Sequence, residues 1–393
     1  MGSKTKAARA KIAWHAFPRR TVGTRSLFGL ALGISKGIQM TDEKNTVILS
    51  GIRPTGRLHY GNYFGAVKDF LRLQDEGHDC YYFVADYHAL TTIKEHTDYY
   101  RQTLDMLRTY VACGLDPKRS TIYRQSDIQS TTELALLLGM MTNIGHLERG
   151  TTYKDAVSKL PGDSTSRPDG NPISYGLLGY PILMATDILI VKSDIVPVGH
   201  DQRQHVEMAI DIAKKFNHRF GETLKIPRSV PKTAVRLPGL DGGAKMGKSD
   251  NNDLGLLDDP KLVLKKIKGV PTTTDPLPLK TESNEPDDVI PEMPATVGAL
   301  YFFLHLLAPK DVYLDFVGKY RRGEKFYGNL KTTLAEHVSR FNAPIIEAFH
   351  APGNTDETVE EFLRENAQKV TPVTIETVEA CREAMGIGRS LYR

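Results

Sequence analysis

Apolar and polar positions form two alternating patterns along the first part of the chain. Three short runs, rich in β-branched and aromatic residues, are typical of buried strands: 46–49, 80–85 and 121–123. Between them, apolar residues recur at the spacing of a helix face, from Phe64 to a stop at Glu76-Gly77 and from Leu104 to a stop at Gly114. Strands that alternate with helices predict an α/β fold with a Rossmann-like, doubly wound parallel sheet.

The pattern changes after about residue 285, where strand signals fade. Helical spacing then dominates in three segments: 297–307, 334–349 and 359–367. We therefore predict a C-terminal helical domain and divide the chain into four parts: a basic leader (1–39), the α/β domain (40–240), a glycine- and lysine-containing loop with a linker (241–285) and the helical domain (286–393). The Gly/Pro-rich stretch 159–172 is expected to be a surface loop.

The first strand-to-helix turn carries the sequence RLHYGNYFGA, residues 57–66. In parallel sheets such turns open where ligands bind, and the first turn of a helix presents unpaired N–H groups to anions. His59 and Asn62 offer N–H donors for phosphate oxygens, and Gly61 lets a nucleotide approach the backbone closely. The alternative is an ordinary turn in which Asn62 caps the helix.

A second glycine-rich stretch, residues 242–249, places Lys245 and Lys248 three positions apart on a loop that we expect to be a flexible arm. In nucleotidyl transfer, negative charge builds on the pyrophosphate leaving group, and ammonium groups in position stabilise it. The alternative is a solvated basic turn without chemistry.

Residues 180–189, YPILMATDIL, predict a helix that carries Tyr180, Met184 and Asp187 on one face. A lone carboxylate on an apolar face needs a partner. An indole N–H is a donor without an acceptor, so Asp187 would satisfy it while the soft thioether of Met184 packs on the ring. The alternative is structural: Asp187 pairs with Lys192 or caps a neighbouring element.

Composition restricts the class of protein. The 393 residues are 40% hydrophobic and 25% charged, and no apolar run approaches membrane-spanning length. Three scattered cysteines argue against disulfides and against zinc or iron–sulfur sites. The leader holds eight basic residues and no acid; subtracting this +8 from the chain's +4 leaves −4 for residues 40–393. We interpret the leader as the product of translation from an upstream start, so that the working protein begins at Met40 and is cytoplasmic. The alternative is that the leader is a transit peptide for the mitochondrial matrix.

The two glycine-containing stretches together resemble the paired signatures of the class I aminoacyl-tRNA synthetases. Asn62 replaces the usual second histidine of the first signature, and Gly247 replaces the usual serine of the second. The segment 180–189, with residues 195–202 and the Met385–Arg389 run, is similar to the tryptophanyl-tRNA synthetases, and this resemblance covers residues 46–393. Their tyrosyl relatives usually carry glutamine where Met184 stands, so methionine favours tryptophan.

The resemblance implies an enzyme that activates L-tryptophan with ATP and Mg²⁺ and transfers it to tRNA(Trp). The alternatives are a tyrosine-activating relative and a catalytically silent paralogue that binds tRNA or tryptophan. It implies catalytic roles for His59, Asn62, Lys245 and Lys248. It implies an ATP site formed by Ser50, Arg53, Gly61, Asn62, Gly199, Asp201, Gln202, Lys245, Met246, Lys248 and Ser249. The implied tryptophan site consists of Tyr180, Met184, Asp187 and Gln202.

The resemblance also implies that the helical domain reads the anticodon and that the protein is a homodimer, with neither a membrane nor DNA as partner. Within this domain, residues 319–331 mix cations with aromatic side chains on which unpaired bases can stack. The alternative is a solvated loop whose aromatic side chains pack inward.

Overall fold

A five-stranded parallel sheet lies at the centre of the computed structural model, which describes residues 46–54, 56–92, 98–158, 174–199, 203–231, 237–272, 293–324 and 326–391. The strands are β1 (Val47–Ile52), β2 (Asp79–Val84), β3 (Ser120–Arg124), β4 (Ile195–Val198) and β5 (Arg228–Pro231). Their order is β3-β2-β1-β4-β5, which confirms the predicted doubly wound sheet. β1 continues past the predicted stop at Ser50-Gly51, because its pairing with β2 runs on to Ile52 opposite Val84.

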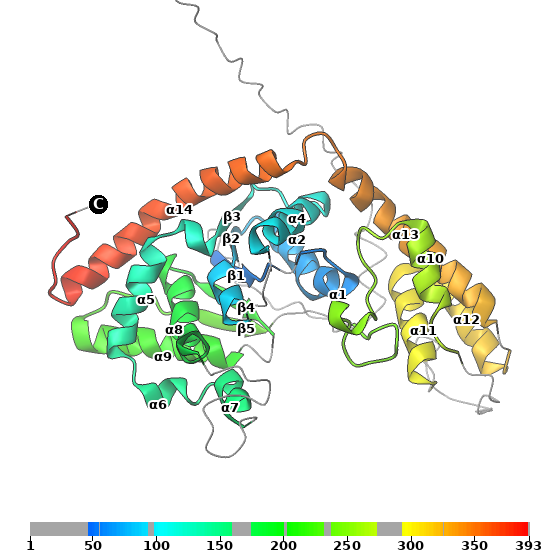
Figure 1. Ribbon diagram of the computed structural model, residues 1–393, viewed down its shortest axis with the longest axis horizontal. Helices are drawn as coiled ribbons and strands as arrows, with labels where there is room; N and C mark the ends of the chain where they lie inside the picture. Colours follow the sequence, from blue (N-terminus) through cyan, green and yellow to red (C-terminus); the bar gives the residue numbers. More distant parts are fainter. Residues whose placement is uncertain are drawn as a thin grey trace, which may run out of the picture.

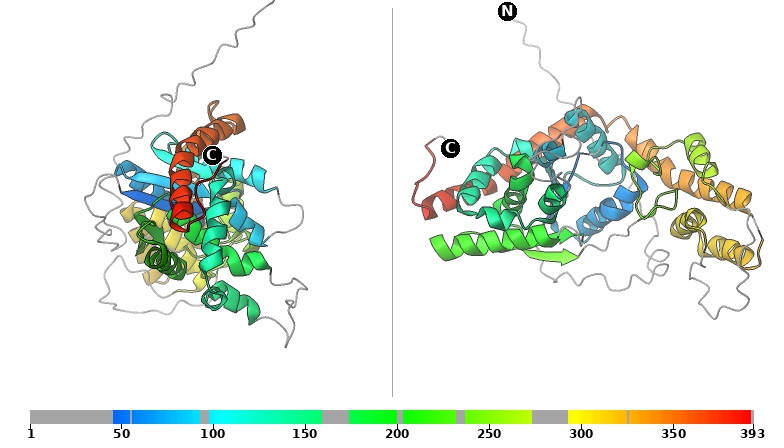
Figure 2. Two further views of the ribbon diagram at one scale, coloured as in Figure 1. Left: turned by 90° about the vertical axis from the view of Figure 1, so that its left-hand side faces the viewer. Right: turned by 60° about the horizontal axis from the view of Figure 1, so that its bottom comes forward.

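Alternate residues of the strands face two different hydrophobic cores. Ile48 and Tyr82 pack with α2 (Lys68–Asp75) and α4 (Tyr99–Ala112) on one face. Leu49 and Phe83 pack on the other face with α5 (Ser130–Met141), α8 (Tyr175–Ile190) and α9 (Arg203–Phe220). Figures 1 and 2 show these helices on both sides of the sheet. The strand-to-helix alternation read from the sequence therefore produces two buried layers.

The remaining helices complete the description. Short helical segments follow the strands and loops: α1 (Tyr60–Asn62), a π-helical turn (Tyr63–Val67), α3 (Asp86–Ala89), α6 (Ile144–Leu147), α7 (Thr151–Val157) and 3₁₀ turns at Leu90–Thr92, Gln125–Asp127 and Lys248–Asp250. Longer helices follow the loop region: α10 (Pro260–Lys268), α11 (Ala295–Leu307), α12 (Lys310–Arg321), α13 (Tyr327–Phe349) and α14 (Asp356–Ala384). No helix among these residues is long and apolar enough to cross a membrane.

The helical part divides differently from the sequence interpretation. α10 to α13 form a separate unit beside the sheet, whereas α14 runs back along the α/β body (Figure 1). Val370, Val378 and Cys381 of α14 belong to the core of the α5–α8–α9 face. α10, which the sequence assigned to a linker, packs against α13. The helices expected after residue 285 are thus confirmed, and the bounds of the helical domain at 286–393 stay a prediction. The leader and the stretch 159–172 lie outside the described residues.

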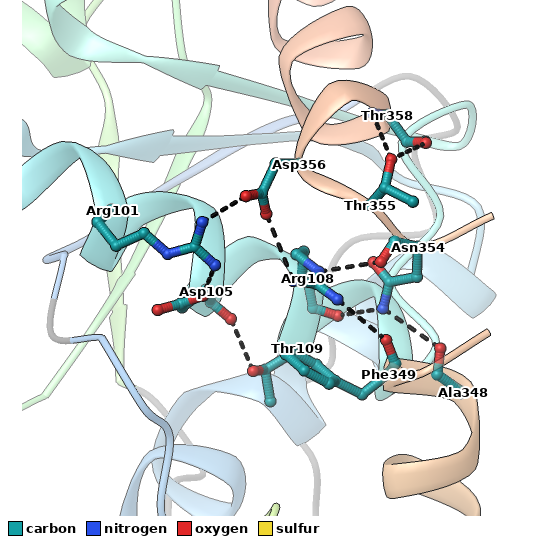
Figure 3. Close-up of polar contacts among 10 residues, drawn as sticks. All are labelled: Arg101, Asp105, Arg108, Thr109, Ala348, Phe349, Asn354, Thr355, Asp356 and Thr358. Atoms are coloured by element: carbon teal, nitrogen blue, oxygen red, sulfur yellow. Dashed lines mark hydrogen bonds and ion pairs between the residues drawn. The ribbon is translucent and has the colours of Figure 1, made fainter. Parts of the chain in front are cut away.

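The turn between α13 and α14 is bound to α4 (Figure 3). Arg108 of α4 donates from Nε to the carbonyl of Asn354 over 2.9 Å, and its guanidinium lies 4.4 Å from the ring centre of Phe349. The Asn354 amide returns a 2.9 Å hydrogen bond to the carbonyl of Arg108. Asp356 forms ion pairs with Arg108 and Arg101. The position at which the chain leaves the helical unit is therefore fixed to the α/β body.

Candidate active site

The strand order places a crevice at the carboxyl ends of β1 and β4. The chain leaves β1 for β2 and β3 on one side, then crosses to β4 and β5 on the other, and ligands bind where this direction reverses. Ser50 is buried within β1, and Arg53 is exposed directly after it. Gly199 follows β4 in the same way. Asp201 and Gln202 lie outside the described residues, so their expected roles stay predictions.

His59 begins the helix after β1, and Asn62 caps it. The backbone N–H of His59 donates to Oδ1 of Asn62 over 3.0 Å, so the capping interpretation is correct for this oxygen. A Cβ on Gly61 would lie 2.8 Å from two ring atoms of His59. Glycine here makes room for the imidazole, and its expected contact with a nucleotide stays a prediction. The π-helical turn that follows was not predicted; such turns are frequent at functional sites.

The imidazole of His59 is neutral and incompletely hydrogen-bonded. Burial lowers its pKa to about 4; Asp253 opposes this shift, and Lys248 and Lys245 add to it. Nδ1 is buried and has no hydrogen-bond partner among the described residues. A buried polar atom without a partner is costly, and a ligand that supplies one removes that cost.

Backbone pairing joins the His59 segment to the residues that follow the lysine stretch. The N–H of Tyr60 donates to the carbonyl of Leu254 over 2.9 Å, and the N–H of Leu256 donates to the carbonyl of Leu58 over 3.0 Å. His59 and Gly255 form the antiparallel bridge between them. The two signatures are therefore adjacent, as the resemblance requires.

The lysine stretch forms a turn held by hydrogen bonds in this structure, and its expected flexibility stays a prediction. Asn252 holds it together: its Nδ2 donates to Asp241 Oδ1 over 2.9 Å and to the carbonyl of Lys245 over 3.2 Å, and its Oδ1 accepts from the N–H of Gly247 over 2.8 Å. Gly242 adopts a φ of +79°, and a Cβ there would lie 2.6 Å from the backbone of Ala295 in α11. This glycine serves a tight turn and a close approach.

The side chains of the stretch differ in exposure. Met246 is buried, Lys245 is exposed and Lys248 is half-buried. Burial lowers the pKa of Lys248, while Asp253 raises it and Arg57 lowers it further. The side chain of Ser249 lies outside the described part of the chain. Two ammonium groups thus stand near His59, where a polyphosphate would carry its charge.

Asp187 is buried on α8 and accepts hydrogen bonds from two other elements. Nε2 of Gln125 lies 2.8 Å from both carboxylate oxygens, and Nε2 of His88 lies 3.0 Å from Oδ2. Burial raises the pKa of Asp187, and these hydrogen bonds oppose the increase. Lys192 instead forms a 2.7 Å ion pair with Glu376, so the alternative pairing of Asp187 with Lys192 is wrong.

Tyr180 joins Asp187 through His88, whose ring meets the Tyr180 ring edge-on at 6.3 Å. The Tyr180 hydroxyl lies 2.5 Å from Nε2 of His205. Met184 is partly buried beside the same core. The predicted helix is confirmed. His88 contacts both Tyr180 and Asp187, and the place of Met184 on their face stays a prediction.

Three residues of this pocket escaped the sequence interpretation: His88, Gln125 and His205. His88 follows β2, and Gln125 directly follows β3, so both stand at carboxyl ends of strands, which is the available signal. Oε1 of Gln125 is buried and has no hydrogen-bond partner within the described ranges. The cluster around Asp187 thus contains a buried acceptor that a ligand donor could satisfy.

The basic and aromatic stretch of the helical unit is mostly packed. Tyr320 is buried, Tyr327 packs against the core, and only Phe326 is exposed among its aromatic side chains. Nζ of Lys331 donates to the carbonyl of Val270 over 2.6 Å, just after α10. The inward-packed interpretation is therefore correct for both tyrosines.

Comparisons with known proteins agree with this geometry. The family model described as tRNA synthetases class I (W and Y) matches residues 41–343. The tryptophan–tRNA ligase of Porphyromonas gingivalis is 38% identical over 342 residues, which make up 86% of this chain and 98% of that protein. The one from Fusobacterium nucleatum is 37% identical over 346 residues, 88% and 99% of the two chains. The crystal structure of the Campylobacter jejuni tryptophanyl-tRNA synthetase, complexed with ADP and tryptophan, aligns with a TM-score of 0.73 and 30% identity over 87% of this chain and 100% of that one.

Proposed function

Because this chain belongs to the tryptophanyl-tRNA synthetases, within the class I tRNA synthetases for tryptophan and tyrosine, we propose how its residues divide the reaction. The enzyme is a tryptophan–tRNA ligase that uses ATP. In the first step a carboxylate oxygen of tryptophan attacks the α-phosphorus of ATP, the bond to the β-phosphate oxygen breaks, and pyrophosphate leaves. In the second step a ribose hydroxyl of the tRNA terminus attacks the activated carbonyl, and AMP leaves.

The first signature and the lysine stretch would serve the ATP side of the site. Neutral His59 donates one ring N–H to a phosphate oxygen, which also removes its unpaired state. Lys245 and Lys248 stabilise the charge that develops on pyrophosphate as the bond breaks. Mg²⁺ enters on the phosphates of ATP, because magnesium keeps several waters and binds substrate phosphates in preference to an all-protein cage.

The pocket beneath α8 would select tryptophan. Asp187 accepts the indole N–H in addition to the hydrogen bonds from Gln125 and His88, because a carboxylate has about four acceptor sites. Met184 and Tyr180 line the ring. Phenylalanine would leave the buried carboxylate without that donor, which a polar pocket rejects strongly.

One observation carries this proposal: the antiparallel pairing of His59, whose buried Nδ1 has no partner among the described residues, with Gly255 in the segment that follows the lysine stretch. The test is ATP–pyrophosphate exchange with the purified protein and each of the twenty amino acids. Exchange with tryptophan alone is expected, followed by charging of tRNA(Trp). Exchange with tyrosine would contradict the assignment of the Asp187 pocket, and no exchange at all would favour a silent binding protein.

The helical unit α11–α13 is proposed to contact the tRNA, and α5–α6 to form a homodimer interface. Leu136, Met140 and Ile144 stand four residues apart and are 58%, 73% and 63% exposed, which is a large apolar stripe for a surface. Met140→Asp should convert the dimer to a monomer in sedimentation velocity. Ile226→Asp, at an exposed apolar position outside the stripe, is the control; a monomeric wild type would contradict the proposal.

The compartment is proposed from the leader. We expect a cytoplasmic protein if translation in the cell starts at Met40. We expect a protein of the mitochondrial matrix if residues 1–39 are a transit peptide. Fluorescent fusions with and without residues 1–39 distinguish these, because only a transit peptide would direct the fusion to the matrix.

A further inference from the structure

Asn342 of α13 is a fully buried polar side chain that contacts the first signature and the segment that follows the lysine stretch. Its exposed fraction is 0%. Nδ2 donates to the carbonyl of Gly255 over 3.0 Å and to that of Asp258 over 3.2 Å. Oδ1 accepts from the hydroxyl of Tyr60 over 2.9 Å. The side-chain amide of Asn342 therefore forms hydrogen bonds through both its nitrogen and its oxygen to residues beside the site.

The partners of Asn342 belong to the two segments that pair beside His59. Tyr60 is the next residue after His59, and Gly255 is the residue that bridges to His59. The Asp258 carboxylate is buried and binds Arg57, the N–H of Gly255 and Nζ of Lys266, the last over 2.8 Å. Asn342 thus fixes the distance between the first signature and the segment that continues from the lysine stretch.

Aromatic packing surrounds this hydrogen-bond junction. The ring of Tyr60 meets Phe303 of α11 edge-on at 6.4 Å and Phe341 of α13 at 5.3 Å. An apolar side chain at position 342 would match the aromatic rings but would leave the carbonyls of Gly255 and Asp258 without this donor. What the amide adds is direction, because each of its hydrogen bonds fails if its partner shifts by about 1 Å.

We propose that Asn342 is a positioning residue for the adenylation step: through Tyr60, Gly255 and Asp258 it holds His59 and the lysine stretch in register. This inference rests on the proposed function and deepens it, because it assigns a residue of the helical unit to the ATP side of the site. The tryptophan pocket on α8 has no hydrogen bond to Asn342 among those described. The residue should therefore affect the rate of adenylation and not the affinity for tryptophan.

The test is single-turnover formation of tryptophanyl-adenylate by the full chain, with concentrations set by active-site titration. Asn342→Leu removes the amide at similar volume, and Asn342→Ala removes it with a cavity. Both should slow adenylate formation by about tenfold or more, the scale for a small misplacement of reacting groups, with the Kd of tryptophan within about twofold. Tyr60→Phe, which removes one of the three hydrogen bonds, should show a smaller effect.

Asn217→Ala is the matched control. Asn217 is also buried, and Nδ2 donates to the carbonyl of Leu224 over 2.8 Å while Oδ1 accepts from its N–H over 2.8 Å, within the α9 region. It should lower thermal stability without slowing the single turnover. If the Asn342 variants turn over at the wild-type rate, or slow only as much as Asn217→Ala, the positioning role is wrong. If the wild type forms no tryptophanyl-adenylate, the proposed function is wrong and the inference fails with it.

Discussion

Replacing Asp187 by asparagine tests the tryptophan pocket most directly. The carboxylate already accepts from Gln125 and His88, and the indole N–H would be its third donor. An amide of the same shape presents an NH₂ group in place of one oxygen, so one of these donors loses its acceptor. A hydrogen bond to a charged group contributes about 1.5–3 kcal/mol, which corresponds to tryptophan binding that is about 10- to 150-fold weaker.

The composition of the chain makes binding easy to measure. Trp14, in the leader, is the only tryptophan, so a Trp14→Phe background has no indole of its own and the fluorescence of added tryptophan reports binding without protein background. Thr186→Val is the control on the same helix, because within the described part of the chain the Thr186 hydroxyl donates to the carbonyl of Ile182 in the preceding turn and not to Asp187. It should leave the affinity unchanged.

Two results decide the outcome. Asp187→Ala should also lower the free energy of unfolding, because the buried Gln125 amide then lacks this acceptor at about 1–3 kcal/mol, and the partly exposed His88 loses its partner as well. Circular dichroism during urea unfolding measures this. If folded Asp187→Asn binds tryptophan as tightly as the parent, the indole N–H is bound elsewhere. Oε1 of Gln125, a buried acceptor without a partner in the described residues, is then the group to mutate next.

Three further outcomes are expected. Lys248→Ala should slow single-turnover adenylate formation by about a hundredfold or more, the scale for loss of one transition-state contact, with unchanged tryptophan affinity; an unchanged rate would refute the role of the lysine stretch. The pKa of His59 is about 4 in the fold, below its unfolded value, so its contribution to stability is complete above the unfolded pKa and is lost as the pH falls toward 4. This loss in the free energy of unfolding is about 1 kcal/mol after discounting for partial exposure. In urea unfolding at a series of pH values, His59→Gln should lose about 1 kcal/mol less than the wild type as the pH falls. An equal loss in both proteins would contradict the lowered pKa of His59. Deleting residues 1–39 should leave aminoacylation intact, and lost activity would show that the leader belongs to the working enzyme.

The sequence predicted those elements whose pattern is local. β2 and α4 follow from runs and spacings within a few residues, and the structure places them within one to five residues of the prediction. β5 has no such pattern: RSVP holds one apolar residue besides its proline and becomes a strand only because β4 lies beside it. α14 was predicted only in part, since Pro372 and several threonines interrupt its helical spacing, although the helix runs unbroken to Ala384.

The site divides in the same way. Motif residues such as His59 and Lys248 could be found from the sequence, because the residues of each motif lie within a few positions of one another. Their supports could not, because Gln125 meets Asp187 across 62 positions and Tyr60 meets Asn342 across 282. A buried hydrogen bond between distant segments leaves no local pattern, and only the fold shows that the donor and the acceptor meet.

Two of the contacts between the helical unit and the α/β body differ in kind. At the α13–α14 turn, Arg108 contacts backbone carbonyls at the edge of the α/β body, as Figure 3 shows. Asn342 lies on the same helix, seven residues before the end of α13 at Phe349, about 10 Å along its axis. Because a helix transmits rotation along its length, any turning of α13 about the Arg108 contact displaces the Asn342 amide relative to Gly255 and Tyr60. If Asn342 has the proposed positioning role, a shift of the helical unit is expected to change the register between the first signature and the segment after the lysine stretch.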